Sequence, residues 1–95
     1  MNRMKMALGQ NYPNPFNPAT TIQYSVRERQ WVTLTIFNHL GQYVNTLVQS
    51  YRNAGTYRTK WDGKKQNGMP AANGVYFCRL QSEKSTLIRK MTLLR

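Results

Sequence analysis

The amino-acid sequence predicts an all-β fold, an immunoglobulin-like antiparallel β-sandwich of about six to seven strands. Three observations lead to this prediction. Apolar and polar residues alternate with a period of two along several short segments, as in strands with one buried and one solvated face. Turn residues separate these segments at a spacing typical of an all-β sandwich. No segment carries the i, i+3, i+4, i+7 apolar pattern of an amphipathic helix over three turns.

The strands are expected to begin near residues 20, 31, 42, 56, 75 and 86. In the first of them Ile22, Tyr24 and Val26 alternate with polar residues, and later segments repeat the pattern. β-branched and aromatic residues fill the apolar positions, which suits a pleated, half-buried surface. The turns between the strands are predicted at Asn38-His39-Leu40-Gly41, Asn53-Ala54-Gly55, Asp62-Gly63, Asn67-Gly68 and Asn73-Gly74.

Two of the predicted strands are less regular than the others. One covers residues 43–48, and the other runs from Leu87 to Leu94 with apolar residues on both faces. Leu87, Met91 and Leu93 share one face of the last strand, and Ile88 and Leu94 lie on the opposite face. A bulge, or a central position in the sheet, would account for this pattern.

The chain is long enough for one small domain. We assign residues 1–7 to a linker or non-native start and residues 8–95 to the domain. Within the domain, residues 8–19 form an extended proline-rich strap and residues 20–95 form the β-sandwich.

Three prolines, at positions 13, 15 and 18, define the strap. Proline fixes its own φ and favours extended geometry in the residue before it. We expect Tyr12 and Phe16 to pin this segment by packing. The strap would then cover a sheet edge that otherwise invites pairing with another chain.

The composition excludes several classes of protein. A single cysteine, Cys78, excludes a disulfide within the chain, and a single histidine, His39, excludes zinc sites that use two histidines. No apolar run approaches the ~18 residues of a membrane span, and no apolar stretch of a secretory signal peptide follows the start. We expect His39 to be an exposed turn residue and Cys78 to be a buried, inert thiol.

No catalytic, metal or cofactor site is predicted. Asp62 has no second carboxylate near it, so an Asx-type turn before Gly63 is favoured over a calcium site. The glycine-containing dipeptides of the same loop open no helix and do not form a phosphate-binding loop. No nucleophile, base and orienting group can be brought together, so the sequence does not predict an enzyme.

The chain is strongly basic, with 14 Lys and Arg against 3 Asp and Glu and a net charge of +11. Basic residues beside aromatic ones, as in Tyr57-Arg58 and Lys60-Trp61, can form a nucleic-acid surface. Here the charges are spread over loops and outward strand positions, whereas Tyr57 and Trp61 share the inward phase. We therefore expect no specific nucleic-acid partner, only weak non-specific binding at low salt.

Short motifs follow one another in order along residues 8–95. A proline-rich opening precedes an N-x-L-G-Q hairpin, A-G-x-Y and W-D-G elements, a G-V-Y-x-x-x-L strand and a basic, apolar terminus. In this order the chain resembles the type A C-terminal sorting domains of the type IX (Por) secretion system. The motif residues with expected structural roles are Asn11, Tyr12, Pro13, Asn14, Pro15, Phe16, Pro18, Gly41, Gly55, Trp61, Asp62 and Gly63.

The resemblance implies a sorting signal rather than a catalyst. Such domains direct an upstream passenger through an outer-membrane translocon, and a surface sortase commonly removes them. The implied partners are the type IX translocon, the sortase components and the passenger, with no membrane span. The implied location is secreted or cell surface after transit through the periplasm, as part of a longer precursor.

The resemblance places the recognition signal in the last two strands. A terminal strand can be read at its edge or drawn away by a partner through strand addition. The candidate signal residues are Gly74, Val75, Tyr76, Leu80, Arg89, Lys90, Met91, Leu93, Leu94 and Arg95. The alternative function is a structural immunoglobulin-like module of a surface or flagellar-hook assembly protein, which would not depend on a free C-terminus.

Overall fold

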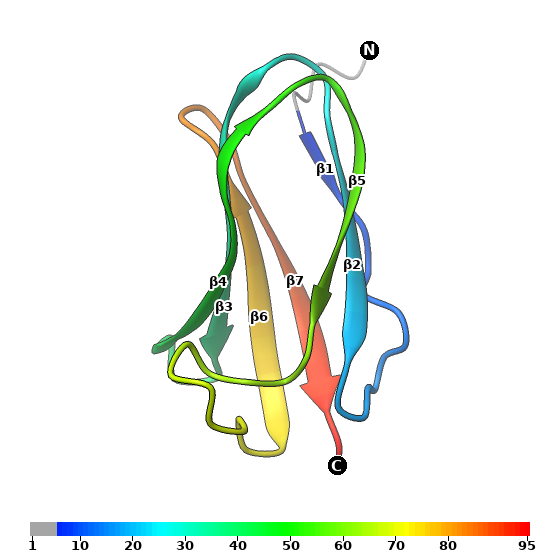
Figure 1. Ribbon diagram of the computed structural model, residues 1–95, viewed down its shortest axis with the longest axis vertical. Coiled ribbons are helices and arrows are strands. Elements are labelled where there is room, and N and C mark those ends of the chain that lie inside the picture. The colour runs from blue at the N-terminus through cyan, green and yellow to red at the C-terminus, as the bar shows by residue number, and fades with distance from the viewer. Residues whose placement is uncertain (1–5) are drawn as a thin grey trace.

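The computed structural model describes residues 6–95, which form two antiparallel sheets packed face to face (Figure 1). This confirms the predicted all-β, immunoglobulin-like sandwich. The three-stranded sheet has the order β1-β2-β5, with β1 at Met6–Leu8, β2 at Thr20–Val26 and β5 at Gly55–Trp61. The four-stranded sheet has the order β4-β3-β6-β7, with β3 at Gln30–Asn38, β4 at Tyr43–Arg52, β6 at Gly74–Gln81 and β7 at Thr86–Leu93.

The core lies between the sheets and is built from the inward positions of the alternating strands. Val32, Leu34 and Ile36 of β3 have no exposed surface at all, because β3 lies inside its sheet with β4 and β6 on either side. Each side chain of this kind contributes about 1.5–3 kcal/mol through its removal from water. The two sheets together bury Met6, Leu8, Phe16, Ile22, Tyr24, Val26, Val32, Leu34, Ile36, Val44, Val48, Trp61, Ala71, Tyr76, Cys78, Leu80, Met91 and Leu93.

The first strand begins earlier than the sequence predicts. Met6 and Ala7 lie in β1, where they pair with Val26 and Ser25 of β2, and the Met6 side chain is buried in the core. Their assignment to a linker is therefore wrong, whereas residues 1–5 of that linker lie outside the described residues. A strand of only three residues is too short to show a period of two.

The last strand is an edge strand with unbroken register. Each residue from Thr86 to Leu93 pairs with β6 without a bulge, so the expected bulge or central position is wrong. Ile88 is instead left 57% exposed on the outer face. The irregular segment at 43–48 does contain two register shifts against β3, and Val44 and Val48 are both buried there.

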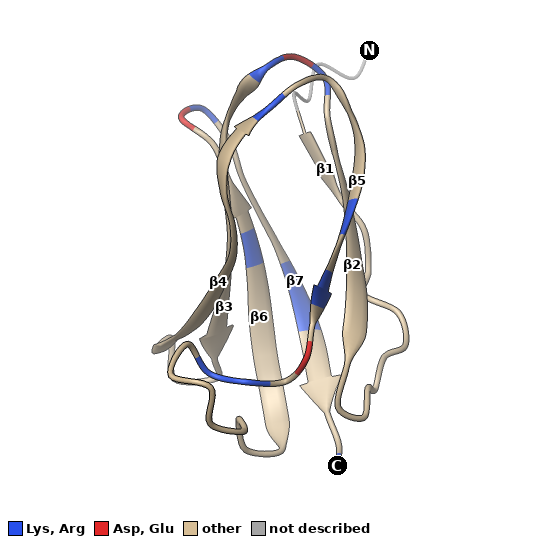
Figure 2. Cartoon of the chain, in the orientation of Figure 1, with Lys and Arg blue, Asp and Glu red and all other residues tan. Residues whose placement is uncertain are grey.

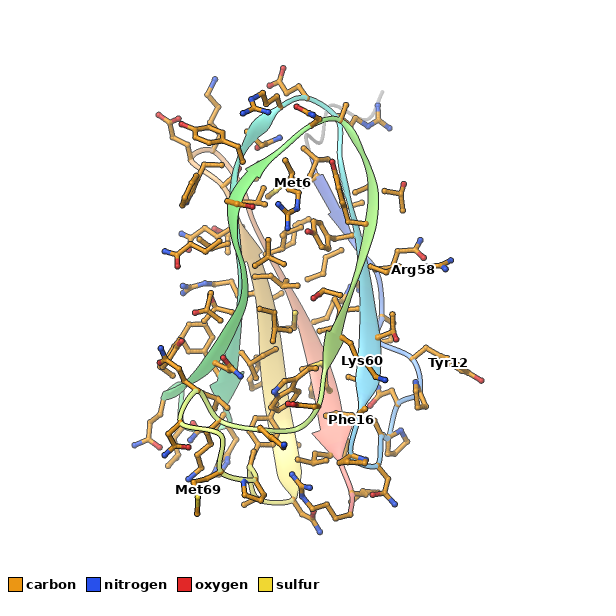
Figure 3. All side chains as sticks on the ribbon, viewed as in Figure 1. Met6, Tyr12, Phe16, Arg58, Lys60 and Met69 are labelled. Atoms are coloured by element: carbon orange, nitrogen blue, oxygen red, sulfur yellow. The ribbon has the colours of Figure 1, made fainter. Side chains whose placement is uncertain are left out.

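The proline-rich strap runs from β1 to β2 and crosses to the other sheet at one point. Its Phe16 is buried as expected, but Tyr12 is 80% exposed and points away from the sandwich (Figure 3). Tyr12 holds the strap through its backbone alone, by two hydrogen bonds of 2.9 Å with Thr21. Phe16 exchanges backbone hydrogen bonds with Thr92 and Leu94, so the strap covers the free edge of β7 as predicted.

Candidate functional site

Four segments that are distant in the sequence meet at the end of the sandwich where β7 ends, here named the C-terminal end (Figure 1). They are the strap, the β3–β4 hairpin, the β5–β6 loop and the residues after β7. β3, β5 and β7 all end there, while β2 and β6 begin there. The N-x-L-G-Q hairpin, the W-D-G element, the start of the G-V-Y-x-x-x-L strand and the end of the basic terminus therefore lie at this end, whereas the Gly55 of A-G-x-Y starts β5 at the opposite end.

Trp61 forms the centre of this end. Its ring lies 5.5 Å from that of Phe16 and 5.2 Å from that of Tyr76, in tilted and edge-to-face arrangements. The indole N–H donates a hydrogen bond of 2.9 Å to the carbonyl oxygen of Lys64. Each aromatic pair contributes about 0.5–1.5 kcal/mol beyond area burial. Trp61 thus joins the strap, the W-D-G element and β6 in one cluster.

Gly63 occupies a position that no other residue fits without strain. Its φ is +76°, and a Cβ atom there would lie 2.7 Å from the carbonyl oxygen of Pro18. The neighbouring Asp62 accepts a hydrogen bond from the Lys64 N–H, which is the predicted Asx-type turn. The W-D-G element therefore lets the β5–β6 loop pass directly against the strap.

Arg95 fastens the end of the chain to both ends of the β5–β6 loop. Its guanidinium donates to the carbonyl oxygens of Gly63 at 2.7 Å and Ala71 at 3.1 Å, and its backbone N–H donates to Asn73. Sequence reasoning placed Arg95 among the signal residues and gave it no structural role. No sequence feature indicates that role, because the guanidinium bonds to backbone carbonyl oxygens of a loop that is distant in the sequence.

Tyr76 at the start of β6 closes the same loop from the other side. Its hydroxyl donates a hydrogen bond of 2.5 Å to the carbonyl oxygen of Ala72, four residues earlier. Burial raises the pKa of this phenol, and the positive charge of Arg95 opposes that rise. A tyrosine near the start of this strand that bonds back to the preceding backbone is a hallmark of immunoglobulin-like sandwiches.

The polar residues of the strap satisfy one another. Asn11 is 3% exposed, and its amide donates to Thr20 Oγ1 at 3.0 Å and to the carbonyl oxygen of Pro13. Thr20 donates to the same Pro13 oxygen at 2.9 Å. Further along, Asn14 Oδ1 accepts the N–H of Thr92 on β7. The strap therefore contributes structure through the hydrogen bonds of Asn11, Pro13 and Asn14. Pro13, Asn14 and Pro15 are all exposed.

The β3–β4 hairpin is built around one asparagine. Asn38 Oδ1 accepts the backbone N–H groups of both Leu40 and Gln42 at 2.9 Å, and its amide donates to Gln42 Oε1. Gly41 completes the turn with a φ of +79°. These contacts explain the structural roles of Asn38, Gly41 and Gln42 in the N-x-L-G-Q element. His39 is exposed in this turn, as predicted.

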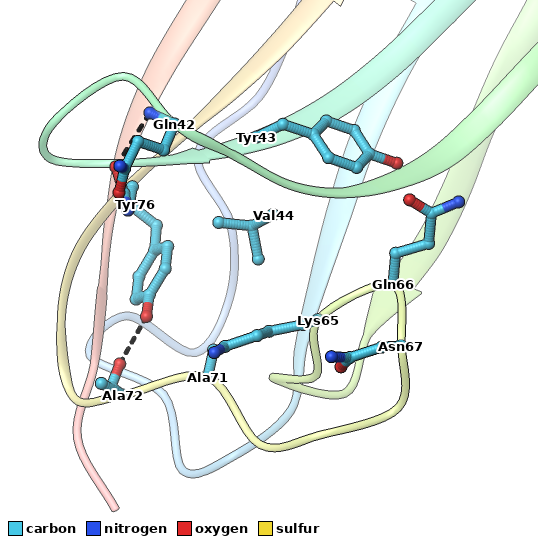
Figure 4. Close-up of a pocket in the computed structure, with 10 residues that line it drawn as sticks. Gln42, Tyr43, Val44, Lys65, Gln66, Asn67, Ala71, Ala72 and Tyr76 are labelled. Atoms are coloured by element: carbon cyan, nitrogen blue, oxygen red, sulfur yellow. Dashed lines mark hydrogen bonds between the residues drawn. The ribbon is translucent and has the colours of Figure 1, made fainter.

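A groove of about 730 Å³ opens between this hairpin and the β5–β6 loop (Figure 4). Gln42 and Tyr43 line it from the hairpin, Lys65 and Asn67 from the loop, and Tyr76 from β6. Its described lining includes no carboxylate, histidine or thiol. The groove therefore offers amides, hydroxyls and one amine, which suit hydrogen bonds to a bound chain.

The predicted signal residues divide into two groups. Tyr76, Leu80, Met91 and Leu93 are buried in the core, and a partner cannot touch them while the domain is folded. Gly74 and Val75 are half-buried. The four exposed members are Arg89, Lys90, Leu94 and Arg95.

Two of the exposed signal residues already have contacts within the domain. Arg89 donates to the carbonyl oxygen of Leu8 on β1 at 2.9 Å, and Arg95 is held by the β5–β6 loop. Lys90 and Leu94 keep their side chains in solvent, and Leu94 is 50% exposed. These two are therefore the candidate residues most open to a partner.

Cys78 is 1% exposed, and burial raises the pKa of its thiol to about 12. It is therefore the buried, unreactive thiol that the sequence predicts. Among residues 6–95, no three His, Cys, Asp or Glu side chains lie close enough to hold a metal ion together. The same residues contain no helix with the length and hydrophobicity required to cross a membrane.

The basic side chains lie on many elements rather than in one cluster (Figure 2). Arg58 and Lys60 are exposed, while Arg79 lies with its guanidinium carbon 4.5 Å from the centre of the Phe37 ring. Tyr57 packs against the core and stacks on Tyr24, so it does not form an exposed stacking platform.

Two solved structures from Porphyromonas gingivalis are similar to this chain. The crystal structure of dimeric latent PorU matches with a TM-score of 0.69 and 20% identity, over 94% of this chain and 9% of PorU. PorZ is described as an essential bacterial surface component of the type IX secretion system. It matches with a TM-score of 0.59 and 22% identity, over 95% of this chain and 11% of PorZ. At these identities the likeness shows a shared fold.

The chain thus corresponds to a small part of either structure. A comparison with curated proteins finds no match. The family model of the FlgD Ig-like domain matches residues 19–86, from the end of the strap to the start of β7. Because this match covers most of the sandwich, the chain belongs to the FlgD Ig-like domain family.

Proposed function

We propose that the chain is a non-catalytic sorting domain that directs an upstream passenger across the bacterial outer membrane through the type IX secretion system. A surface sortase then removes it. The partners are the translocon and sortase components and the passenger. The passenger reaches the cell surface or the medium after transit through the periplasm.

One observation carries this proposal. The motifs that resemble sorting domains lie mostly at the C-terminal end, where Arg95 binds the W-D-G loop and Phe16 binds Thr92 and Leu94. The last residues are thus presented in a fixed place beside the strap. The similar fold in PorZ, a surface component of the type IX system, supports the same setting.

Within the predicted signal, Lys90 and Leu94 are the side chains that we assign to recognition. Both are exposed, and neither side chain contributes to the core. The buried members, such as Met91 and Leu93, hold β7 in place instead. In this proposal the secretion machinery recognises the folded domain through an exposed face at its last strand.

An export assay tests the proposal. Residues 6–95, which include all of β1, are fused behind a fluorescent reporter that carries an export signal. The fusion is expressed in a bacterium with a type IX system and in a twin strain that lacks the translocon. We expect the reporter outside the first strain and in the periplasm of the second. An intact, folded fusion that stays inside both strains would contradict the proposal.

The second candidate is a structural module in a surface or flagellar-hook assembly, and the match to the FlgD Ig-like domain favours it. The two functions differ in their need for a free C-terminus. A short polar extension after Arg95 is expected to block export by the sorting route. It would leave the docking of a structural module unchanged, which pull-down of the assembly partner would measure.

A further inference from the structure

The outer edge of β5 is open, unlike two other sheet edges of the sandwich. The strap covers the edge of β7, and the β5–β6 loop bonds to the edge of β4 through the Gln66 N–H and the Val44 carbonyl oxygen. Within residues 6–95, no backbone hydrogen bond reaches β5 from its outer side. Free backbone groups on a strand edge are a template for pairing with another chain.

The hydrogen bonds of β2 identify the free groups of β5. Thr21 exchanges backbone bonds with Tyr12, and the Gln23 carbonyl oxygen accepts the Gly9 N–H, so both residues turn their backbone groups away from β5. Successive residues of a strand direct these groups to opposite edges. The intervening residues of β2 therefore bond to β5, at its positions 57, 59 and 61. The free groups of β5 belong to Thr56, Arg58 and Lys60.

The same three residues carry the exposed side chains of β5. Figure 3 shows Arg58 extending into solvent, and Arg58 Nε donates to Gln23 Oε1 at 3.2 Å. Neither β4 nor β5 contains an Asp or Glu. Asp62 follows β5, and its carboxylate accepts the Lys64 N–H. This edge therefore presents free backbone groups together with two positive charges two residues apart.

A second copy of the chain is a poor partner for this edge. Antiparallel pairing of two β5 edges about Thr59 would place Arg58 of each copy opposite Lys60 of the other, and pairing about Arg58 would place the two Arg58 residues opposite each other. Like charges directly opposite one another destabilise a strand pair, whereas opposite charges stabilise it. The net charge of +11 adds to the repulsion between copies and attracts acidic partners.

We propose that the outer edge of β5 binds an extended acidic peptide segment by strand addition. The segment adds a fourth strand to the β1-β2-β5 sheet through the free groups of Thr56, Arg58 and Lys60. Acidic side chains at alternate positions lie opposite Arg58 and Lys60, on the solvent face. The residues between them turn toward Tyr57 and Thr59, so they are small or apolar.

The experiment uses the full chain and two capped, fluorescein-labelled nonapeptides of the same composition. In one peptide Glu alternates with Val and Thr, and in the other the Glu residues are grouped at one end. Fluorescence anisotropy at 150 mM salt measures affinity. Protection of the Thr56, Arg58 and Lys60 amides from hydrogen exchange locates the bound peptide. Lys60→Glu is compared with Lys84→Glu, an exposed turn residue whose reversal changes the net charge equally.

We expect the alternating peptide to bind at least about tenfold more tightly than the grouped one, with protection confined to β5. Lys60→Glu should weaken this binding about tenfold, and Lys84→Glu by less than about threefold. Equal binding of both peptides, equal loss in both variants, protection on another strand, or no binding at millimolar peptide would each overturn the proposal. A wild-type chain that dimerises through β5 at low salt would overturn it in favour of self-association.

Discussion

The guanidinium of Arg95 donates a hydrogen bond of 2.7 Å to the carbonyl oxygen of Gly63, which lies 32 positions earlier in the chain. The same Gly63 is pressed against Pro18, so three distant segments meet at one glycine. The C-terminal residues are therefore part of the folded structure at this end. Substitutions at this end should distinguish the residues that stabilise the fold from the residues that a partner recognises.

Gly63 should tolerate no side chain. In Gly63→Ala the new Cβ would meet the Pro18 carbonyl oxygen at 2.7 Å, in a backbone conformation that already disfavours alanine. We expect a loss of about 3 kcal/mol of unfolding free energy, measured by urea denaturation. Gly68→Ala is the matched control, because its φ of +87° is similar but its surroundings are open. It should lose about 1 kcal/mol. Equal losses would show that crowding by Pro18 has no effect.

Arg95→Ala should destabilise the domain modestly. The substitution removes the hydrogen bonds to Gly63 and Ala71 and leaves their carbonyl oxygens to water. We expect a loss of about 1–2 kcal/mol in the same denaturation experiment. Leu94→Ala should change stability by no more than about 0.5 kcal/mol, because its side chain is half-exposed. A neutral Arg95→Ala would contradict the structural role of this residue.

The β3–β4 hairpin should depend on the side-chain oxygen of Asn38. Asn38→Ala removes the acceptor of the Leu40 and Gln42 N–H groups and should cost about 1 kcal/mol. Asn38→Asp keeps this acceptor and loses only the amide bond to Gln42, so it should cost less. The midpoint of thermal unfolding measures both. If the two variants lose the same stability, the amide group rather than the oxygen holds the turn.

Alkaline pH should destabilise the domain through Cys78. Burial raises its pKa from 9.0 to about 12, so between these values the folded thiol keeps a proton that the unfolded chain has lost. Stability from this group is complete below pH 9 and is lost as the pH rises toward 12, by about 1.4 kcal/mol per pH unit. Cys78→Val removes this titration, and the raised pKa of Tyr76 acts equally in both proteins. Between pH 8 and about 10.5, the unfolding free energy measured by urea denaturation should fall more steeply with pH in the wild type than in the variant. Equal slopes in the two proteins would contradict a buried, protonated thiol.

The sequence predicts the strands well because burial and alternation have the same period. Ile22, Tyr24 and Val26 show the inward phase in their spacing alone, and all three are buried. β1 could not be found this way, because its two inward residues do not make a pattern. The exposure of Ile88 was also hidden, since an apolar residue at a sheet edge looks the same in sequence as one in the core.

The sequence predicted which residues belong to the candidate site, but it did not predict how they are arranged. The motifs identified Trp61, Gly63, Phe16 and Tyr76, and the structure brings all four to one end. Tyr12 has the same motif membership as Phe16, yet only Phe16 packs inside. The guanidinium of Arg95 bonds to backbone carbonyl oxygens, which every residue has. No residue type could therefore mark them in advance.

The central claim is that the exposed side chains of Lys90 on β7 and of Leu94 just after it, on a folded domain, form the export signal. Removing β7 cannot test it, because Met91 and Leu93 belong to the core and the truncated domain would not fold. The most direct measurement is the location of the reporter when the fused domain carries Lys90→Glu and Leu94→Ser. Tyr12→Ser at the same end is the exposed control.

Circular dichroism and urea denaturation first establish that both variants fold as the wild type does. We expect the Lys90 and Leu94 variant to remain in the periplasm, and the Tyr12 variant to be exported like the wild type. Export of the folded Lys90 and Leu94 variant at the wild-type level would contradict the account.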